Sequence, residues 1–241
     1  MRKTIRKYTD RPVDDGLLNQ LLERACRASN TGNMQTYSVV VTRDMEQKKR
    51  LSPAHFNQPM VLQAPVVLTF CADYNRFSHW CRLRQAEPCY DNLQSLVGAG
   101  IDAMLVAQEF ATAAEEAGLG LCFLGTTTYN AQEICEVLRL PRLVVPVTTI
   151  TLGWPAENPE LQDRLPLDGI VHHEQYADYT DADIDRIYAE KEALESSKRF
   201  IEENGKQTLA QVFTEVRYTR EGCETFSEKF RDALVRQGFV K

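Results

Sequence analysis

The 241-residue chain lacks most of the features that mark membrane, secreted or nucleic-acid-binding proteins. No apolar stretch approaches the roughly 18 residues that a membrane-spanning helix needs, and the N-terminus shows no apolar signal-peptide core. A net charge of −6 and an isoelectric point near 5.4 argue against a general nucleic-acid surface, which requires a broad basic field. From these absences we expect a cytoplasmic protein.

Cysteine and histidine show no arrangement that indicates a disulfide framework, a metal site or a side-chain nucleophile. The seven cysteines are odd in number and have no Cys-x-x-Cys spacing. His79, Cys81 and Cys89 lack the fourth ligand and the paired spacing of a zinc site. No Ser-His-Asp or Cys-His arrangement is convincing. We therefore expect no bound metal and no catalytic side chain.

Hydrophobic residues make up 43% of the chain, which is enough for one large domain, or one domain with an appendage. Leu18, Leu21 and Leu22 recur at helical spacing after Asp14 and Asp15, which can cap the helix start. Helical patterns alternate with apolar runs of strand length, so we expect an α+β layered domain. The expected strands are residues 37–42, 66–72, 121–125 and 145–152, and further helices are expected over 97–117 and 131–138.

Burial can also be predicted for some of these elements. The runs at 37–42 and 66–72 are consistent with strands buried on both faces, and the helix at 97–117 is apolar around most of its circumference. Gly118 and Gly120 follow this helix and precede a strand, the reverse of the strand-to-helix setting of a dinucleotide fingerprint. We expect them to terminate the helix.

The composition changes near residue 180. A charged helix is expected over 181–204, and a partner helix over 221–238 carries phenylalanines on one side. We therefore divide the chain into a core that includes an extended tail, residues 1–179, and a helical C-terminal arm, residues 180–241.

Two cationic segments lie more than 150 residues apart, Arg2-Lys3-Thr4-Ile5-Arg6-Lys7-Tyr8 and the stretch from Leu152 to Pro166. If the first is extended, Arg2, Thr4 and Arg6 project from one face and can converge on one anion. Arginine suits phosphate because its planar fork donates two parallel hydrogen bonds. The second segment turns at a Gly-Trp-Pro sequence into a tail that carries Arg164. The alternative interpretation of the first segment is a solvated basic N-terminus.

Together with Ala117-Gly118-Leu119-Gly120-Leu121-Cys122-Phe123-Leu124-Gly125, these segments resemble the nitroreductase family of FMN-dependent NAD(P)H oxidoreductases. The similarity is greatest to the oxygen-insensitive nitroreductase and flavin reductase group, and it runs in order from residue 1 to about residue 180. It implies a nitroreductase-like fold, in which helices flank a central, mostly antiparallel sheet. It also implies a homodimer that binds FMN, NADH or NADPH and a small electron acceptor, without nucleic acid or membrane.

The resemblance also assigns site residues. Arg2 and Arg164 match residues that hold the flavin phosphate, with Lys3 beside them and Thr4 donating a hydroxyl. Arg6 falls where a cation approaches the pyrimidine edge of the flavin, where it would favour negative charge on reduction. Gln58 matches a glutamine that addresses the same ring. In relatives, a polar loop from the partner subunit lines the flavin, and the matching residues here are Asn30, Thr31, Gly32, Asn33 and Gln35. A second loop, whose backbone faces the reactive edge of the flavin, corresponds to Leu124, Gly125 and Thr126.

The sequence departs from the family pattern in two places. Gln162 stands where a second tail cation is common, so one charge toward the phosphate is lost. The arginine pair of relatives that select NADPH is absent near residue 204, and only Lys206, Arg217 and Arg220 remain as candidates to meet the 2′-phosphate. The small residues of the long helix, Gly98, Ala99, Gly100, Ala103 and Ala107, would allow close approach of a helix from the dimer partner.

The function implied is transfer of reducing equivalents from NAD(P)H to nitroaromatics, quinones or flavins in alternating half-reactions. The cofactor carries the chemistry and the protein supplies position and field. Two alternatives stay open. One is a flavin-binding or flavin-storage protein with incidental reductase activity, and the other is a structural dimer that has lost the cofactor. Taken singly, Thr4 could be an ordinary strand residue, Gln58 a surface side chain and residues 30–33 a simple turn.

Overall fold

The structure is a computed structural model that describes residues 2–241. It contains two compact units. Unit 1 comprises Met1–Glu160 together with Phe226–Lys241, and unit 2 comprises Leu161–Thr225. These bounds differ from the expected division between residues 179 and 180. The reason is that Ala233, Leu234 and Phe239, near the C-terminus, are buried in a cluster with core residues such as Val145.

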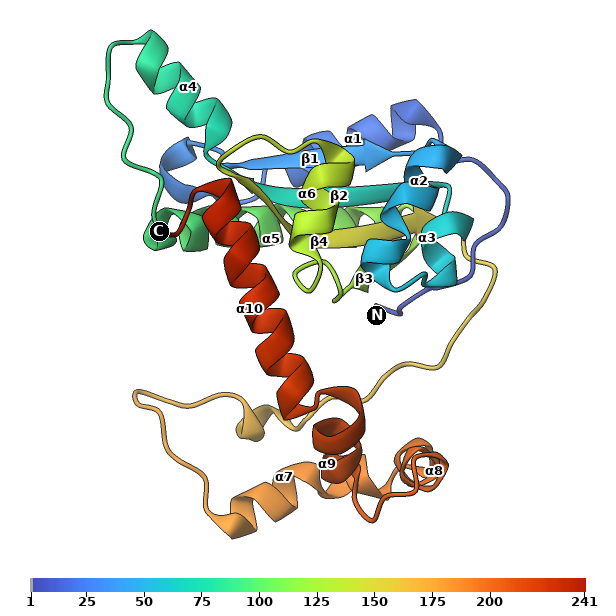
Figure 1. The fold of residues 1–241 in the computed structure, drawn as a ribbon. Helices are drawn as coiled ribbons and strands as arrows, with labels where there is room; N and C mark the ends of the chain where they lie inside the picture. The colour runs from blue at the N-terminus through green and yellow to red at the C-terminus, as the bar shows by residue number, and fades with distance from the viewer. Residues whose placement is uncertain (1) are drawn as a thin grey trace. The chain divides into compact units, whose positions relative to one another are not determined.

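A four-stranded antiparallel sheet forms the centre of unit 1 (Figure 1). Its strands are β1 (Tyr37–Thr42), β2 (Val66–Asp73), β3 (Gly120–Leu124) and β4 (Val144–Gly153), in the order β1-β2-β4-β3. All four predicted strands are confirmed. The central strand β2 is buried at every position, whereas most of β1 is only partly buried. The expectation that β1 is buried on both faces is wrong, because an edge strand has a neighbour on one side only.

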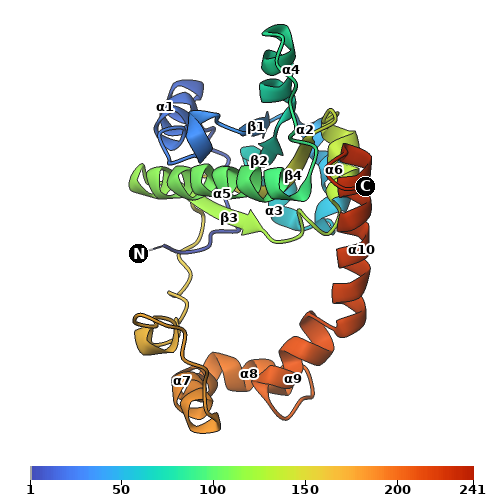
Figure 2. The ribbon, with the colours of Figure 1, turned by 90° about the vertical axis from the view of Figure 1, so that its left-hand side faces the viewer.

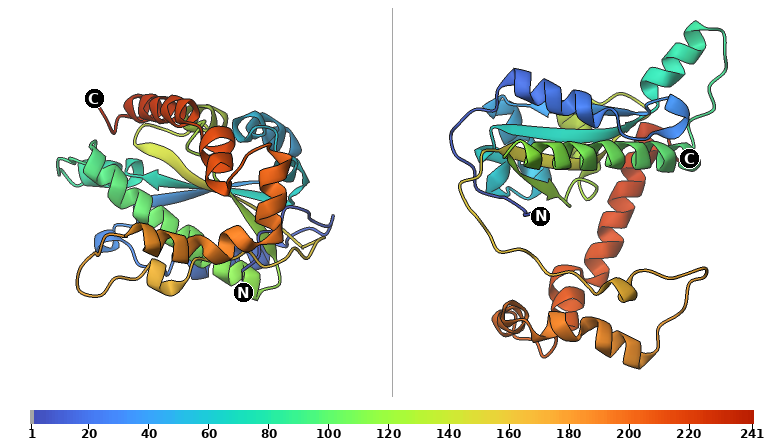
Figure 3. Two further views of the ribbon diagram at one scale, coloured as in Figure 1. Left: turned by 90° about the horizontal axis from the view of Figure 1, so that it is seen from below. Right: turned by 180° about the vertical axis from the view of Figure 1, so that it is seen from behind.

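Helices cover both faces of this sheet. On one face α1 (Asp15–Ala25) and α5 (Leu93–Glu116) lie side by side (Figure 3). Their apolar residues join those of β2 and β4 in the main core. The other face carries α2 (Met45–Leu51), α3 (Pro59–Gln63) and α6 (Ala131–Leu138), while α4 (Asn75–Leu83) follows β2. The predicted helix start at α1 is confirmed, because the Asp14 carboxylate accepts hydrogen bonds from the amides of Gly16 and Leu17.

Helix α5 confirms the predicted long helix, but one of its sides is exposed. Among residues 2–241 it is the single helix that is long and apolar enough to cross a membrane. The expectation that no stretch approaches this length is therefore wrong. Half of the apolar window is buried inside the protein, and core helices satisfy the same two criteria. A cytoplasmic location stays a prediction. Gly118, with φ of 82°, follows the helix in the left-handed conformation expected for a terminating glycine.

One side of α5 is exposed and apolar, and the other is packed against the sheet. Val97, Ile101, Met104 and Leu105 are each more than two-fifths exposed. The expectation that this apolar helix is buried is therefore wrong for this side. The small residues divide between the two sides. Ala99, Ala103 and Ala107 are fully buried within the chain, whereas Gly98 and Gly100 would accept a Cβ atom with no described heavy atom within 4 Å.

Unit 2 is mainly helical and contains a 3-10 turn at Leu167–Gly169, α7 (Asp181–Ala193), α8 (Glu195–Glu203), α9 (Leu209–Val212) and a π-helical turn at Phe213–Arg217 (Figure 2). The single helix predicted over 181–204 is wrong. Leu194 has an extended ψ of 136°, and the Ser197 hydroxyl donates to the Lys191 carbonyl at 2.7 Å. Helix α10 (Arg220–Gln237) begins in unit 2 and ends in unit 1.

Candidate functional site

The N-terminal segment is extended and lies against β3. Thr4 forms a bridge with Leu121, and the Ile5 amide donates to the Leu121 carbonyl at 3.0 Å. Ile5 is buried, so Thr4 and Arg6 on either side of it alternate to the opposite face. A Cβ atom on Gly120 would lie 2.7 Å from the Ile5 side chain, so glycine is required there for this approach.

The charges of Arg2 and Arg6 both act on the side chain of Cys122 in β3. Burial raises the pKa of the Cys122 thiol, and the guanidinium groups of Arg6 and Arg2 partly offset this by favouring the thiolate. Arg2 also lies 5.0 Å from the ring centroid of Phe123 and 3.7 Å from the Glu115 carboxylate. Its Nε is buried and has no hydrogen-bond partner among residues 2–241. The convergence of these two cations on one anion stays a prediction.

The segment after β4 pairs with the N-terminal segment. The Glu157 carboxylate accepts the backbone amides of Arg6 at 2.6 Å and Lys7 at 3.1 Å. The Arg6 amide bond holds the pKa of Glu157 below its usual value. The Lys3 ammonium donates to the Asn158 side chain at 2.7 Å, and Tyr8 bridges to Pro155. The two segments singled out in the sequence therefore meet in space up to Asn158.

The loop that begins at Gly125 and the loop that leads to Gln58 are joined by side-chain hydrogen bonds. His55 is fully buried, and its Nδ1 lies 2.9 Å from the Thr126 hydroxyl. The Asn130 amide donates to the Ala54 carbonyl at 2.9 Å. Burial lowers the pKa of His55 to about 4, so its imidazole is neutral at pH 7. These contacts fix the loop of Gly125 relative to the loop that leads to Gln58.

An aromatic contact from α10 joins the same two loops. Phe56 is half exposed and has a left-handed φ of 53°, as does Asn57 with 52°. The Phe56 ring meets Phe226 edge to face at 5.9 Å, and Phe226 stacks on Tyr129 at 4.3 Å. Consecutive left-handed residues other than glycine are uncommon and persist only where their surroundings hold them.

Gln58 and Gly125 are both accessible. Gln58 precedes α3, and its side chain makes no capping hydrogen bond to that helix within the described chain. Gly125 is exposed, and a Cβ atom on it would have no described heavy atom within 4 Å. Leu124, in contrast, is buried in β3, so only its backbone is available to a ligand.

The predicted polar loop is an exposed turn with an unusual backbone. Gly32, Asn33 and Gln35 have φ values of 56°, 54° and 53°. The Asn30 side chain accepts the Gln35 amide at 3.2 Å, and both the amide and the hydroxyl of Thr31 donate to Asp102. The Thr31 hydroxyl is therefore engaged inside the protein. Gln35 also lines a shallow depression of about 530 Å³ with Met34 and Arg76.

The remaining predicted residues belong to unit 2, and each cation there has a partner. Arg164 donates to the Asp163 carbonyl at 2.7 Å. Lys206 pairs with Glu215 at 2.8 Å, Arg217 lies over the Phe200 ring at 4.9 Å, and Arg220 pairs with Glu224 at 2.9 Å. Gln162 is exposed.

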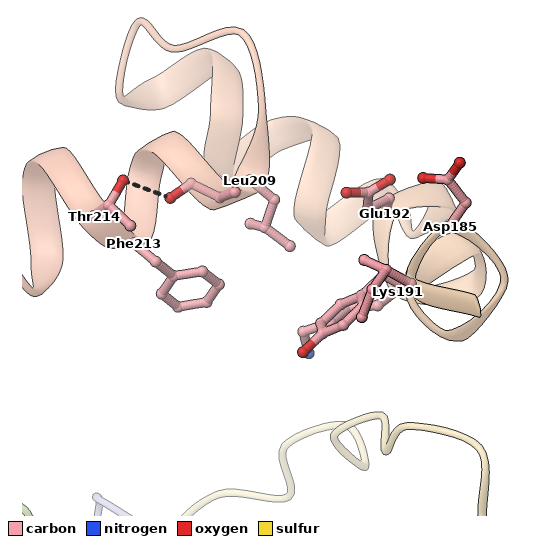
Figure 4. A pocket seen from close by; sticks show the side chains of 9 residues that line it. Asp185, Lys191, Glu192, Leu209, Phe213 and Thr214 are labelled. Atoms are coloured by element: carbon pink, nitrogen blue, oxygen red, sulfur yellow. Dashed lines mark hydrogen bonds between the residues drawn. The ribbon is translucent and has the colours of Figure 1, made fainter. Parts of the chain in front are cut away.

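Unit 2 also contains a cavity of about 390 Å³ between α7 and the region of α9 (Figure 4). Leu209 and Phe213 supply apolar lining, and Tyr188 and Lys191 come from α7. None of the described residues that the sequence assigned to a site lines this cavity.

Sequence reasoning missed four residues that shape these segments: Asp102, Glu157, His55 and Phe226. Asp102 has a local signal, because it is a lone carboxylate in an otherwise apolar stretch of helix. Glu157 lies inside the motif that drew attention, but nothing in its spacing shows that it accepts amides from residues 6 and 7. His55 and Phe226 act through contacts between distant segments and have no comparable local signal.

Comparison with known proteins shows which family this chain resembles. The model of the nitroreductase family matches residues 1–154. The FMN reductase (NAD(P)H) of Bacillus subtilis is 31% identical, over 98% of this chain and 94% of its own length. The oxygen-insensitive NADPH nitroreductase of Salmonella typhimurium is 36% identical, over 72% of this chain and 71% of its own length. A crystal structure of a Bacteroides fragilis protein is 60% identical with a TM-score of 0.98, and it covers 100% of this chain and 98% of that one.

These matches agree with the motifs and with the antiparallel sheet flanked by helices. The family and the α+β fold class predicted from the sequence are confirmed, as is the prediction of an oxidoreductase enzyme. This chain belongs to the nitroreductase family.

Proposed function

We propose that this protein is an FMN-dependent oxidoreductase that transfers reducing equivalents from NADH or NADPH to nitroaromatics, quinones or flavins. The observation that carries the proposal is the pairing of the N-terminal segment with β3 through Thr4 and Ile5, which turns Thr4 and Arg6 to one face. The Arg2 side chain is about a third exposed, so the outer nitrogens of its guanidinium are available to a phosphate oxygen.

The residues of unit 1 fit the parts of FMN. Arg2 and the Thr4 hydroxyl would hold the phosphate, and Arg6 would place positive charge near the pyrimidine edge. Gln58 offers an amide donor and acceptor, and the open space beside Gly125 would admit a ring close to the backbone. Bound FMN supplies hydride acceptance from the nicotinamide and hydride donation to the acceptor. The assignments of Gln162 and Arg164 stay predictions.

The protein is further proposed to act as a homodimer that uses α5 as part of its interface. The exposed residues Val97, Ile101, Met104 and Leu105 form an apolar strip that a second copy would cover. Gly98 and Gly100, open at their Cβ positions, would let a helix of the second copy approach closely. The buried alanines of α5 take no part in this contact.

For the nicotinamide cofactor, we propose little preference between NADH and NADPH. Lys206 and Arg220 are each paired with a glutamate, and Arg217 lies over a phenylalanine ring. Binding of a 2′-phosphate by one of these cations would have to compete with its present partner, which reduces the gain in affinity.

The proposal predicts that the purified protein carries about one noncovalent FMN per subunit, because unit 1 supplies phosphate donors without a dinucleotide fingerprint. Acid precipitation followed by chromatography of the supernatant identifies the flavin. Finding FAD, covalently bound flavin or no flavin after reconstitution would contradict the assignment. If FMN binds but NAD(P)H does not reduce it, a flavin-storage protein is the better description.

Steady-state kinetics should show alternating half-reactions. If donor and acceptor use the same open face of the flavin, they cannot bind together, and reduced and oxidised enzyme must alternate. Double-reciprocal plots against NADH or NADPH at several fixed concentrations of a quinone are therefore expected to be parallel. Intersecting lines would require a ternary complex and exclude the shared position.

A further inference from the structure

A buried carboxylate on α5 is bonded to both ends of the exposed loop of residues 30–36. Asp102 is 1% exposed. Its Oδ1 accepts the Thr31 amide at 2.9 Å and the Thr31 hydroxyl at 3.0 Å, and its Oδ2 accepts the Thr36 hydroxyl at 2.8 Å. A buried carboxylate is costly unless it is hydrogen-bonded, and all three of these bonds come from the loop.

The loop cannot owe its shape to apolar burial. Thr31, Gly32, Asn33 and Gln35 are all exposed, and Gly32, Asn33 and Gln35 are in the left-handed region. Side chains with a Cβ atom rarely adopt this conformation, so the surrounding contacts must hold it. Within the loop, the Gln35 amide donates to the Asn30 side chain and the Met34 amide donates to the Thr31 carbonyl. From outside the loop, Asp102 bonds residues 31 and 36, on either side of the left-handed positions.

A second brace holds the C-terminal end of the loop. Arg76 donates to the carbonyls of Gln35 and Tyr37, the latter at 3.2 Å. The Asp73 carboxylate accepts the Ser38 hydroxyl and the Arg76 amide. Residues 35–38 are thus fixed to the end of β2. Among residues 2–241, the side-chain hydrogen bonds that join residues 31–36 to α5 are those of Asp102.

We propose that Asp102 is a positioning residue that holds the loop of residues 30–36 in the conformation in which its amide side chains contact the flavin. The inference rests on the proposed function, because the flavin is the ligand that the loop would serve. Asp102 itself is buried and bonded to the loop, so it acts through Asn30, Asn33 and Gln35 and not by touching the ligand.

The test combines loop dynamics with flavin affinity. In Asp102→Asn, one acceptor oxygen becomes an amide donor that cannot accept the threonine bonds on that side. Amide hydrogen exchange over residues 30–37 of the FMN-free protein is expected to accelerate by about tenfold or more, and the FMN dissociation constant to rise by about tenfold. Thr36→Val, which removes the 2.8 Å bond to Oδ2 and leaves both Thr31 bonds in place, should change both quantities in the same direction by less.

Val106→Ala is the matched control. Val106 lies one turn further along α5 and is fully buried in the main core. Its truncation should lower the melting temperature without altering loop exchange or FMN affinity. If Asp102→Asn does not fold, Thr36→Val decides the question by the same two measurements.

The outcomes separate the inference from the proposed function. Unchanged exchange over residues 30–37 in Asp102→Asn and Thr36→Val would overturn the anchoring role. Faster exchange with unchanged FMN affinity would overturn the link to the flavin. If the parent protein binds no FMN, the proposed function fails, and the exchange measurement alone still decides whether Asp102 holds the loop.

Discussion

Replacing Arg2 with alanine is expected to weaken FMN binding by about ten- to a hundredfold, because a charge-assisted hydrogen bond contributes roughly 1.5 to 3 kcal/mol. The fold should persist. The ion pair of Arg2 with Glu115 is long, at 3.7 Å, and its facing atoms are buried, so its loss should lower the free energy of unfolding by about 1 to 3 kcal/mol. Fluorescence titration of FMN-free protein measures the affinity, and urea unfolding measures the stability.

Arg24→Ala provides the matched control for this prediction. Its guanidinium pairs with Glu109 at 3.0 Å and Glu116 at 2.5 Å, and it has no part in the proposed site. Its removal should leave the FMN dissociation constant unchanged. An Arg2→Ala protein that binds FMN as tightly as the parent would remove this residue from the phosphate site.

The secondary structure of unit 1 was predictable where a local pattern determines it. The Asp14 cap, the apolar runs of β2 and β4, and the helix at α6 all have signals within a few residues. The burial of β1 was not predictable in this way. Strand order decides which strand lies at an edge, and order depends on contacts between residues far apart in sequence.

The break between α7 and α8 shows a second limit of sequence reasoning. Residue 194 is a leucine, a good helix former, and neither glycine nor proline marks the end of α7. The chain nevertheless turns there, and the Ser197 hydroxyl donates a hydrogen bond to the Lys191 carbonyl. A serine in a charged stretch gives no indication in advance that it will make this bond.

In the candidate site, too, some features follow from a local sequence pattern and others depend on contacts between distant segments. Alternation in the N-terminal segment predicted that Thr4 and Arg6 share a face, and the buried Ile5 between them agrees with this. The supporting contacts of Glu157 and Asp102 join elements that are 150 and 71 residues apart in sequence. Such contacts follow from the assembled sheet and its helices, so spacing in the sequence could not predict them.

Acid is expected to destabilise the protein through His55. Burial lowers the pKa of this residue to about 4, from 6.5 in an exposed histidine. Between these two values the unfolded chain binds a proton that the folded protein excludes, so the free energy of unfolding falls as the pH is lowered from about 6.5 to about 4. At about 1.4 kcal/mol per pKa unit, the loss attributable to His55 approaches about 3 kcal/mol.

Urea unfolding at pH 7 and at pH 4.5 measures this loss, and His55→Gln isolates it. Glutamine retains a group that can bond the Thr126 hydroxyl, which lies 2.9 Å from the imidazole, but it does not titrate. The variant is expected to be less stable than the parent at pH 7, because the buried site was shaped for an imidazole. Its stability should then fall less between the two pH values, by about 2 kcal/mol or more. Carboxylates with lowered pKa values, such as Glu157, are common to both proteins and cancel in the comparison. Equal losses in parent and variant would show that His55 takes up its proton in the folded protein as readily as in the unfolded chain.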